Sequence, residues 1–232
     1  MSRISEILFK SFRLLRDEPK LFLPKLASTF LSSIWILAAV SGQLSTAQMV
    51  VSFPFIMFLG VFVSLMVASM VKNRESDRIL KKGFFEAVKS WKVILPTTVF
   101  FLITGFVVVI PLGIGLTYFI RFGNLAALLI GLMLSLFLIV GISFLSYFLP
   151  ITLLEKGSFT SGFRKSMDSS KRSSKTVIAL TLFSMILLGL AFGSSEYLEK
   201  LGYLGFLVGR LLATTVNTYL FVISPSYYID YN

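Results

Sequence analysis

Long apolar runs alternate along this chain with short segments in which charged and apolar residues are mixed. Six runs are long enough to cross the hydrocarbon core of a bilayer, which takes a helix of about 20 residues. They cover residues 22–41, 49–71, 94–120, 124–149, 176–193 and 201–223. The pattern predicts an all-α fold, a polytopic membrane bundle of six transmembrane helices.

Three mixed segments, each in front of a pair of apolar runs, place apolar and charged residues on opposite faces at a period of 3.6. Such amphipathic helices are typical of the membrane interface, with the basic face toward the phosphates. The segments cover residues 3–17, 78–91 and, with a weaker pattern rich in serine, 158–172. They share a basic residue followed by serine, as Lys10-Ser11, Lys89-Ser90 and Lys165-Ser166.

The order of amphipathic segment and apolar pair occurs three times, which predicts three repeats within a single integral membrane domain over residues 1–232. The repeats cover about 1–71, 72–150 and 151–232. Each contains two spans, so all three begin on the same side of the membrane. They are parallel repeats related by an axis along the membrane normal, which argues against a transporter built from inverted halves.

Composition agrees with lipid as the main solvent of the chain. Hydrophobic residues make up 56% and charged residues 14%, and the mean hydropathy is +0.86. A soluble domain has about a quarter of charged residues. The polar residues here are too few to cover a water-facing globule.

The basic residues are strongly biased toward one side of the predicted membrane domain. Nineteen of the 22 lysines and arginines lie in the N-terminal segment and in the two connections 72–92 and 156–175. Only Arg121 and Lys200 fall on the other side, and Arg210 lies near the middle of the sixth run. By the positive-inside rule both termini are cytoplasmic. Anionic lipid headgroups explain the net charge of +11 better than nucleic acid does, because the excess lies beside the spans.

Nine of these residues, on the polar faces of the three amphipathic segments, form what we call the basic collar. They are Lys10, Arg13, Lys81, Lys82, Lys89, Arg164, Lys165, Lys171 and Arg172. One interpretation is that the collar only fixes topology. The other is that the collar gathers anionic headgroups or docks a protein partner, because three aligned basic segments exceed what orientation requires. A homo-oligomer is compatible with either interpretation.

One segment resembles a known group of membrane proteins. Residues 148–157 read FLPITLLEKG and are followed by FRKS at 163–166, and residues 82–91, KGFFEAVKSW, are an earlier copy of the same element. This pattern is similar to that of prokaryotic six-span proteins of unknown function. They include the membrane domain of some glycerophosphodiester phosphodiesterases and the YciC-type inner-membrane proteins. The resemblance implies six helices in a cell membrane and no established catalytic residues.

Residue types exclude several classes of membrane enzyme. The chain has no cysteine and no histidine, so thiol chemistry, histidine-type phosphatases and HExxH metal motifs are excluded. Glu75 and Asp77 are the nearest approach to a metal-binding pair, but Arg74 and Arg78 beside them favour a solvated charge cluster. Ser-Lys catalysis at the repeated motif stays open, although a lysine on a water-facing surface is a poor base. We predict no metal, no cofactor and no enzymatic activity.

Arg210 is the one residue in the spans whose burial in lipid is costly. Thr214 and Asn217 follow it at four and seven residues and share its helix face. A charge inside the membrane costs about 2.5–3.5 kcal/mol and normally faces the protein interior or a cavity. Three roles are open for Arg210: an interhelical clamp to carbonyls freed near Pro111, a site for an anion, a lipid phosphate or a substrate, and snorkelling to one surface.

Two functions follow from these patterns. The first is a non-enzymatic membrane scaffold or lipid-organising protein that uses its basic collar on the cytoplasmic side. The alternative is a small transporter, or a lipid- or anion-handling channel, with a site around Arg210. A wet cavity reaching Arg210 would favour the alternative, and a solidly packed bundle would favour the scaffold.

Overall fold

The computed structural model describes residues 3–231, most of which are helical, with no strand among them. Six helical segments are long and apolar enough to cross a membrane, which confirms the predicted all-α bundle of a multi-pass membrane protein. In chain order the helices are α1 (Arg3–Asp17), the 3₁₀ helix η1 (Pro19–Phe22), α2 (Leu23–Val40), α3 (Thr46–Lys72), α4 (Ile79–Lys89), α5 (Trp91–Phe122), α6 (Leu125–Leu145), α7 (Leu149–Lys156), α8 (Phe159–Arg172), α9 (Ser174–Glu199) and α10 (Tyr203–Tyr231).

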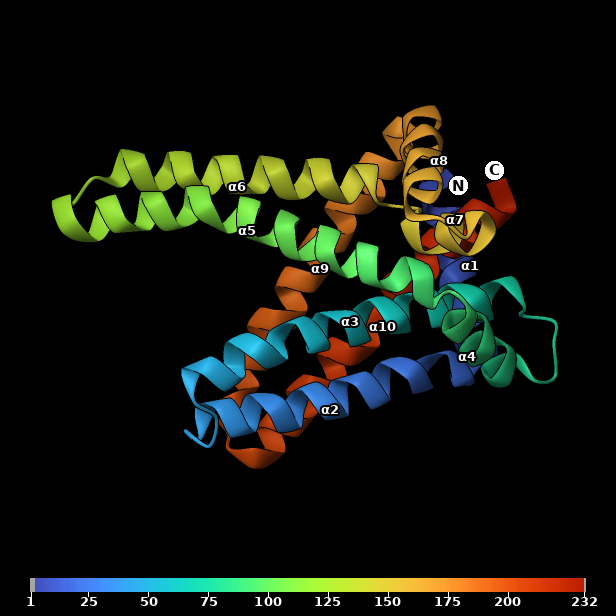
Figure 1. The fold of residues 1–232 in the computed structure, drawn as a ribbon, viewed down its shortest axis with the longest axis horizontal. Helices are drawn as coiled ribbons and strands as arrows, with labels where there is room; N and C mark the ends of the chain where they lie inside the picture. The colour runs from blue at the N-terminus through green and yellow to red at the C-terminus, as the bar shows by residue number, and fades with distance from the viewer. Residues whose placement is uncertain (1–2, 232) are drawn as a thin grey trace.

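The long helices form three antiparallel hairpins, α2–α3, α5–α6 and α9–α10 (Figure 1). The short helices α1, α4, α7 and α8 gather at one end of the molecule, together with both chain termini (Figure 1). We call this the basic end and the opposite one the far end. The hairpins contact one another as a ring, because α3 packs on α5, α6 on α9, and α10 on both α2 and α3.

Local sequence signals close the hairpins at the far end. Ser45 begins α3 with a capping box, in which its hydroxyl accepts from the Gln48 amide and the Gln48 side chain accepts from the Ser45 amide. Gly123 ends α5 in the left-handed conformation with φ of 64°, which glycine adopts without steric cost. The Asn124 side chain then accepts from the Ala127 amide and caps α6. These tight turns make neighbouring helices antiparallel.

The packed core lies toward the basic end, where the short helices meet α3 and α10. Val222, Ile223 and Tyr227 near the C-terminal end of α10 are fully buried or nearly so, as are Phe148 and Ile151 at the start of α7. These side chains belong to two continuous clusters that join α1, α3, α4, α7 and α9. The far halves of the hairpins have fewer buried side chains.

Glycines allow close approach within two of the hairpins. A Cβ atom added to Gly131 on α6 would lie 2.5 Å from the Pro111 carbonyl oxygen of α5, and one on Gly115 would lie 2.6 Å from that of Ala127. In α9–α10, a Cβ on Gly209 would lie 2.6 Å from the Ser195 hydroxyl. Small residues are the usual contact between helices in lipid, where backbone approach replaces the hydrophobic effect.

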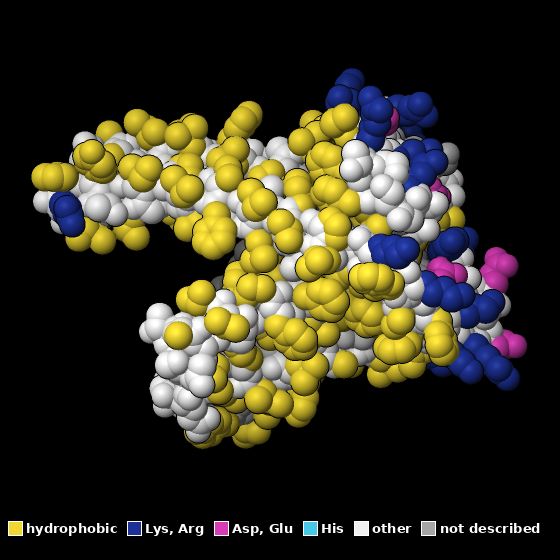
Figure 2. All heavy atoms as spheres, viewed as in Figure 1, with side chains coloured by type: hydrophobic (Ala, Val, Ile, Leu, Met, Phe, Trp, Pro, Cys, Tyr) yellow, Lys and Arg dark blue, Asp and Glu magenta, His cyan; other side chains and the backbone are white. Residues whose placement is uncertain are grey.

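The far half of α5–α6 leans away from the other two hairpins (Figure 1). The space-filling view shows a cleft between this hairpin and the rest of the molecule (Figure 2). Within the hairpin, the Ser135 hydroxyl of α6 donates to the Val108 carbonyl of α5 over 2.7 Å. Most other side chains of its far half are exposed and apolar, such as Phe106, Ile120 and Met133, and face acyl chains in a bilayer.

Three spans differ clearly from the bounds that the apolar runs predict, and one of them is the fifth, since α9 continues to Glu199 and not to residue 193. The fourth run was expected to continue as one helix to residue 149, but α6 ends at Leu145 and α7 begins at Leu149. At this break the Ser166 hydroxyl donates to the Leu145 carbonyl and accepts from the Phe148 amide. The sixth run was expected to end at 223, but α10 continues through Pro225 to Tyr231. Its last turns are buried by protein, so apolarity alone does not mark their end.

Candidate functional site: a basic end and a polar seam between helices

The basic collar lies on three short helices at one end of the molecule. α1, α4 and α8 form close to the predicted segments 3–17, 78–91 and 158–172, so these helices are confirmed. Eight of the nine collar residues are exposed, and Lys165 is half-buried. Figure 2 shows lysine and arginine side chains gathered at this end, with few on the rest of the visible face. Whether these helices lie parallel to a membrane stays a prediction.

Each short helix docks on the protein through a narrow row of side chains and leaves other apolar residues outside. The docking rows repeat every four residues and consist of Ile7, Ser11 and Leu15 on α1, Ile79, Gly83 and Ala87 on α4, and Gly162, Ser166 and Ser170 on α8, all buried. On α1 the neighbouring Phe9 and Phe12 stay 56% and 59% exposed. The apolar faces are therefore divided between protein contact and an outer surface suited to lipid.

The repeated serine has a structural environment in all three copies. Ser11 and Ser166 are completely buried in their docking rows, and Ser166 bridges the break between α6 and α7. Ser90 ends α4, and its hydroxyl donates to the Glu86 carbonyl over 2.8 Å. Lys10, the basic residue of the first copy, forms an ion pair with Asp230 over 2.9 Å. This geometry favours packing and helix ends over a Ser-Lys mechanism.

Carboxylates at the basic end bind side chains of other elements. Asp230 on α10 lies 2.9 Å from Lys10 and 3.6 Å from Arg74. Glu86 on α4 accepts from the Ser69 hydroxyl over 2.8 Å, and Glu155 on α7 accepts from the Tyr228 hydroxyl over 2.7 Å. Glu75 and Asp77 lie in the connection before α4. Within residues 3–231, no group of three or more acidic side chains is placed to hold a metal ion.

Arg210 on α10 forms hydrogen bonds to two hydroxyl groups of α2. Its Nε donates to Ser33 Oγ over 3.0 Å, and a terminal nitrogen donates to Ser32 Oγ over 3.1 Å. The two serines in turn donate to the Thr29 carbonyl, over 2.7 Å and 3.0 Å. A cation is thus fixed by neutral acceptors in an interface between the first and last hairpins.

The contact between α2 and α10 continues as a polar seam toward the basic end. Thr214 Oγ1 is buried, 2.8 Å from Thr29 Oγ1, and also donates to the Arg210 carbonyl. Lys25 Nζ lies 4.9 Å from the centre of the Phe221 ring, a cation–π contact. Asn217 lies between Thr214 and Phe221 along α10 and is half-buried, and its side-chain amide has no hydrogen bond within residues 3–231.

The position of Arg210 differs from two expectations. Its partners are hydroxyls on α2 and not the carbonyls near Pro111. The reason is that α5–α6 leans away, and the Val108 carbonyl near this proline accepts from Ser135. Arg210 is also the eighth residue of α10, about 10 Å from the helix start at 1.5 Å per residue, and so lies in the far part of the span rather than at its middle.

Sequence reasoning missed the partners of Arg210, although a signal for them exists. Thr29, Ser32 and Ser33 stand at spacings of three and four in an otherwise apolar run, so they share one face of α2. Each was unremarkable alone, since hydroxyls inside a helix are often satisfied by the carbonyl four residues earlier. Paired with an arginine in another span, such a triplet predicts an interhelical contact.

Comparison with known proteins finds no match to a protein-family model, to a curated protein or to a solved structure. The resemblance to the YciC-type proteins and to the membrane domain of glycerophosphodiester phosphodiesterases therefore stays a prediction.

Proposed function

We propose that this protein is a non-enzymatic membrane scaffold that organises anionic lipid at the cytoplasmic face of a cell membrane. The observation that carries the proposal is the placing of eight exposed collar residues on three short helices at one end. A basic residue near an anionic surface contributes about 1 kcal/mol of attraction. Three such helices around one bundle surround it with a ring of positive charge at headgroup level.

The exposed aromatic residues on the same helices support this proposal. Phe9 and Phe12 on α1, Phe84 and Phe85 on α4, and Trp91 at the start of α5 are all 46% exposed or more. Apolar residues beside basic ones are typical of helices that lie in the membrane interface. We include in the proposal the orientation with both termini in the cytoplasm and the relation to the six-span family.

The alternative of a transporter or channel around Arg210 receives less support. The Nε and one terminal nitrogen of Arg210 are already bonded to serines, as expected of a clamp between helices. Neither of the two apolar grooves described below is lined by Arg210. We therefore propose a clamp role for Arg210, in agreement with a scaffold.

The lipid proposal is tested with vesicles that contain spin-labelled phosphatidylglycerol or phosphatidylcholine. The wild-type protein should immobilise the anionic lipid with several-fold preference at low salt and with less preference at 1 M salt, where the Debye length is about 3 Å. Equal immobilisation of the two lipids by the wild-type protein would contradict the proposal.

The matched variants change charge at opposite ends. The collar variant replaces exposed residues that have no ion pair within residues 3–231, with glutamine at Arg13, Lys82, Lys89, Arg164, Lys171 and Arg172. Its preference for phosphatidylglycerol should fall toward one. The control, with glutamine at Arg121 and Lys200, should keep the wild-type preference because these residues lie at the far end.

A further inference from the structure

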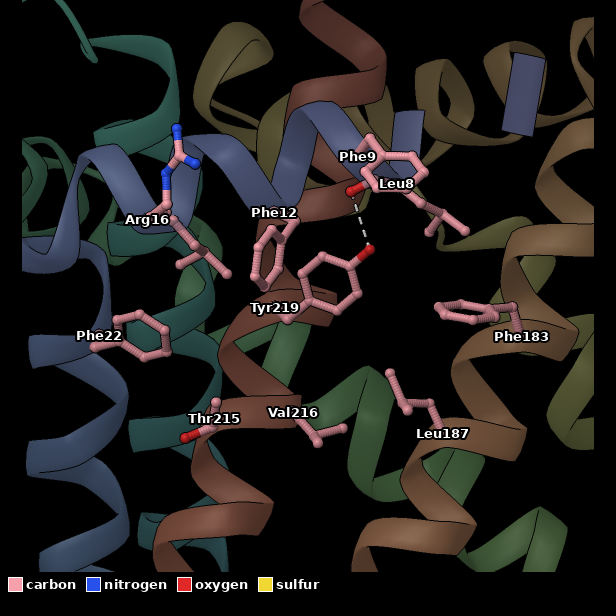
Figure 3. Close-up of a pocket in the computed structure, with 11 residues that line it drawn as sticks. Leu8, Phe9, Phe12, Arg16, Phe22, Phe183, Leu187, Thr215, Val216 and Tyr219 are labelled. Atoms are coloured by element: carbon pink, nitrogen blue, oxygen red, sulfur yellow. Dashed lines mark hydrogen bonds between the residues drawn. The ribbon is translucent and has the colours of Figure 1, made fainter. Parts of the chain in front are cut away.

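An apolar groove of about 770 Å³ lies beneath α1, between α9 and α10 (Figure 3). Phe12 and Tyr219 stand on one side of it, and Phe183 and Leu187 of α9 face them across the groove (Figure 3). The Tyr219 hydroxyl is already bonded to the Leu8 carbonyl, over 3.0 Å. The polar side chain that remains for a ligand at the α1 edge is therefore that of Arg16.

Arg16 is placed as a headgroup contact would be. Its guanidinium group points away from the apolar interior of the groove, from the side of α1 that faces the basic end (Figure 3). It pairs with Asp17 over 3.1 Å, and both side chains are more than half exposed. An exposed pair of this kind contributes little, typically less than about 1 kcal/mol, so the guanidinium can also bind a phosphate.

A second groove, of about 490 Å³, repeats this arrangement with different residues. It lies between α2 and α3 beneath α4, with Ala27, Leu31 and Phe62 among its lining residues. Lys81 of α4 stands at its edge and is exposed. In both cases a short basic helix covers the gap between the two helices of a hairpin: α1 covers α9–α10, and α4 covers α2–α3.

The remaining hairpin, α5–α6, is also covered by a short helix, α8, but aromatic rings occupy the space between them. α8 packs on α5 and α6, and Phe159 and Phe163 of α8 lie with their ring centres 5.6 Å and 5.1 Å from that of Phe100 on α5. The two rings of α8 also stack on each other at 5.9 Å. The protein fills this site with its own side chains and leaves the other two open.

We propose that each of the two open grooves holds one acyl chain of an anionic phospholipid from the leaflet at the basic end, with the phosphate at Arg16 or Lys81. The volumes lie within the range of ligand sites, about 300–1,000 Å³. An apolar groove does not hold ordered water, and in a bilayer the available apolar occupant is a lipid tail. The basic edge selects an anionic headgroup. The inference rests on the proposed function for the headgroup preference and adds two binding sites for the acyl chains.

Native mass spectrometry of the protein released from nanodiscs of phosphatidylglycerol and phosphatidylcholine tests the number of lipid-binding sites. The wild-type protein should retain two phosphatidylglycerol molecules. Val216→Phe fills the groove beneath α1, Ala27→Phe fills the groove beneath α4, and each should retain one. Leu136→Phe, on the exposed outer surface of α6, is the control and should retain two. Unchanged retention of two lipids in both filled variants would overturn the proposal.

Three further comparisons separate this inference from the lipid proposal. Val216→Phe and Ala27→Phe keep all the charges of the protein, so they should keep the wild-type preference for phosphatidylglycerol in the spin-label experiment. The collar variant above keeps Arg16 and Lys81, so it should still retain two lipids. The double variant Arg16→Gln with Lys81→Gln should retain phosphatidylcholine as readily as phosphatidylglycerol.

Photo-crosslinking keeps the inference testable if a filled variant does not fold. Wild-type protein in a bilayer with phosphatidylglycerol that carries a diazirine in its acyl chain should crosslink at Phe183, Leu187 or Val216, and at Leu59 or Phe62. Crosslinks spread evenly over the exposed surface of α5–α6, without enrichment at these positions, would overturn it.

Discussion

Arg210 on α10 donates from Nε to the hydroxyl of Ser33 on α2 over 3.0 Å, and so joins the last span of the chain to the first. The contact places a full charge among neutral acceptors in a membrane-spanning interface. Hydrogen bonds between helices in a membrane contribute about 0.6 kcal/mol on average and up to about 1.7 kcal/mol. The pair of bonds to Ser32 and Ser33 is the strongest candidate for a clamp between the two hairpins.

Removing this clamp should lower stability. Arg210→Leu leaves the two serine hydroxyls without their donor and should cost about 1–3 kcal/mol, seen as a lower midpoint of thermal unfolding in detergent. Thr215→Ala, at an exposed residue of α10 bonded only to its own helix, is the control and should leave the midpoint unchanged. If Arg210 instead binds a ligand, Arg210→Leu would keep the wild-type midpoint, which would contradict the clamp.

Ser166→Ala should destabilise the break between α6 and α7. The Ser166 hydroxyl bonds the Phe148 amide over 3.2 Å and the Leu145 carbonyl over 3.0 Å, and the site is completely buried. Leaving both groups unsatisfied should cost about 1–3 kcal/mol, measured by thermal or denaturant unfolding. Ser161→Ala on the exposed side of α8 should change stability by less than about 0.5 kcal/mol. Equal effects of the two substitutions would be inconsistent with the bridging role.

Gly131→Ala should separate α5 from α6. The added Cβ would lie 2.5 Å from the Pro111 carbonyl oxygen, so the backbones must move apart and lose close contact. Gly141→Ala in the same helix meets nothing within 4 Å and should be neutral or slightly stabilising, by up to about 1 kcal/mol. Unfolding midpoints of the two variants give the comparison, and a Gly131→Ala variant as stable as Gly141→Ala would count against close packing.

Cysteine labelling should establish the orientation, since the chain has no native cysteine. Ser76→Cys, in the connection between α3 and α4, should react with a membrane-impermeant reagent only after the membrane is opened. Gln43→Cys, in the exposed turn between α2 and α3, should react in intact cells. The reverse pattern would place the basic end outside and would exclude a cytoplasmic collar.

The sequence predicts the elements of this fold much better than their contacts. Helix type follows from long apolar runs and from 3.6 periodicity, which are local properties, so α1 was placed from residue 3 to 17 in agreement with the structure. The break after Leu145 could not be predicted in this way, because it depends on Ser166, 21 residues later. The apolar residues on both sides hide the break, although Pro150 in the first turn of α7 is a local signal for a helix start.

The polar seam shows the same limit at the candidate site. The high cost of burying Arg210 indicates that it needs acceptors, but its partners depend on which spans meet, and apolar composition is nearly uniform around them. Pro111 was considered because a proline frees a carbonyl, whereas the lean of α5–α6 away from the other hairpins decides against that contact (Figure 1). The grooves likewise arise from the way α1 and α4 cross neighbouring hairpins.

The docking of α1 on α9 and α10 has a consequence for biosynthesis. α1 leaves the ribosome before α2 to α8, yet the helices on which it docks, α9 and α10, follow them in the chain. Until α9 and α10 insert, α1 lacks the helix with which it makes most of its contacts, and the seam partners on α2 lack Arg210. Contacts between such distant segments are slow to form, because the long intervening chain must first be brought together. Insertion of the final hairpin is therefore the step that closes the ring.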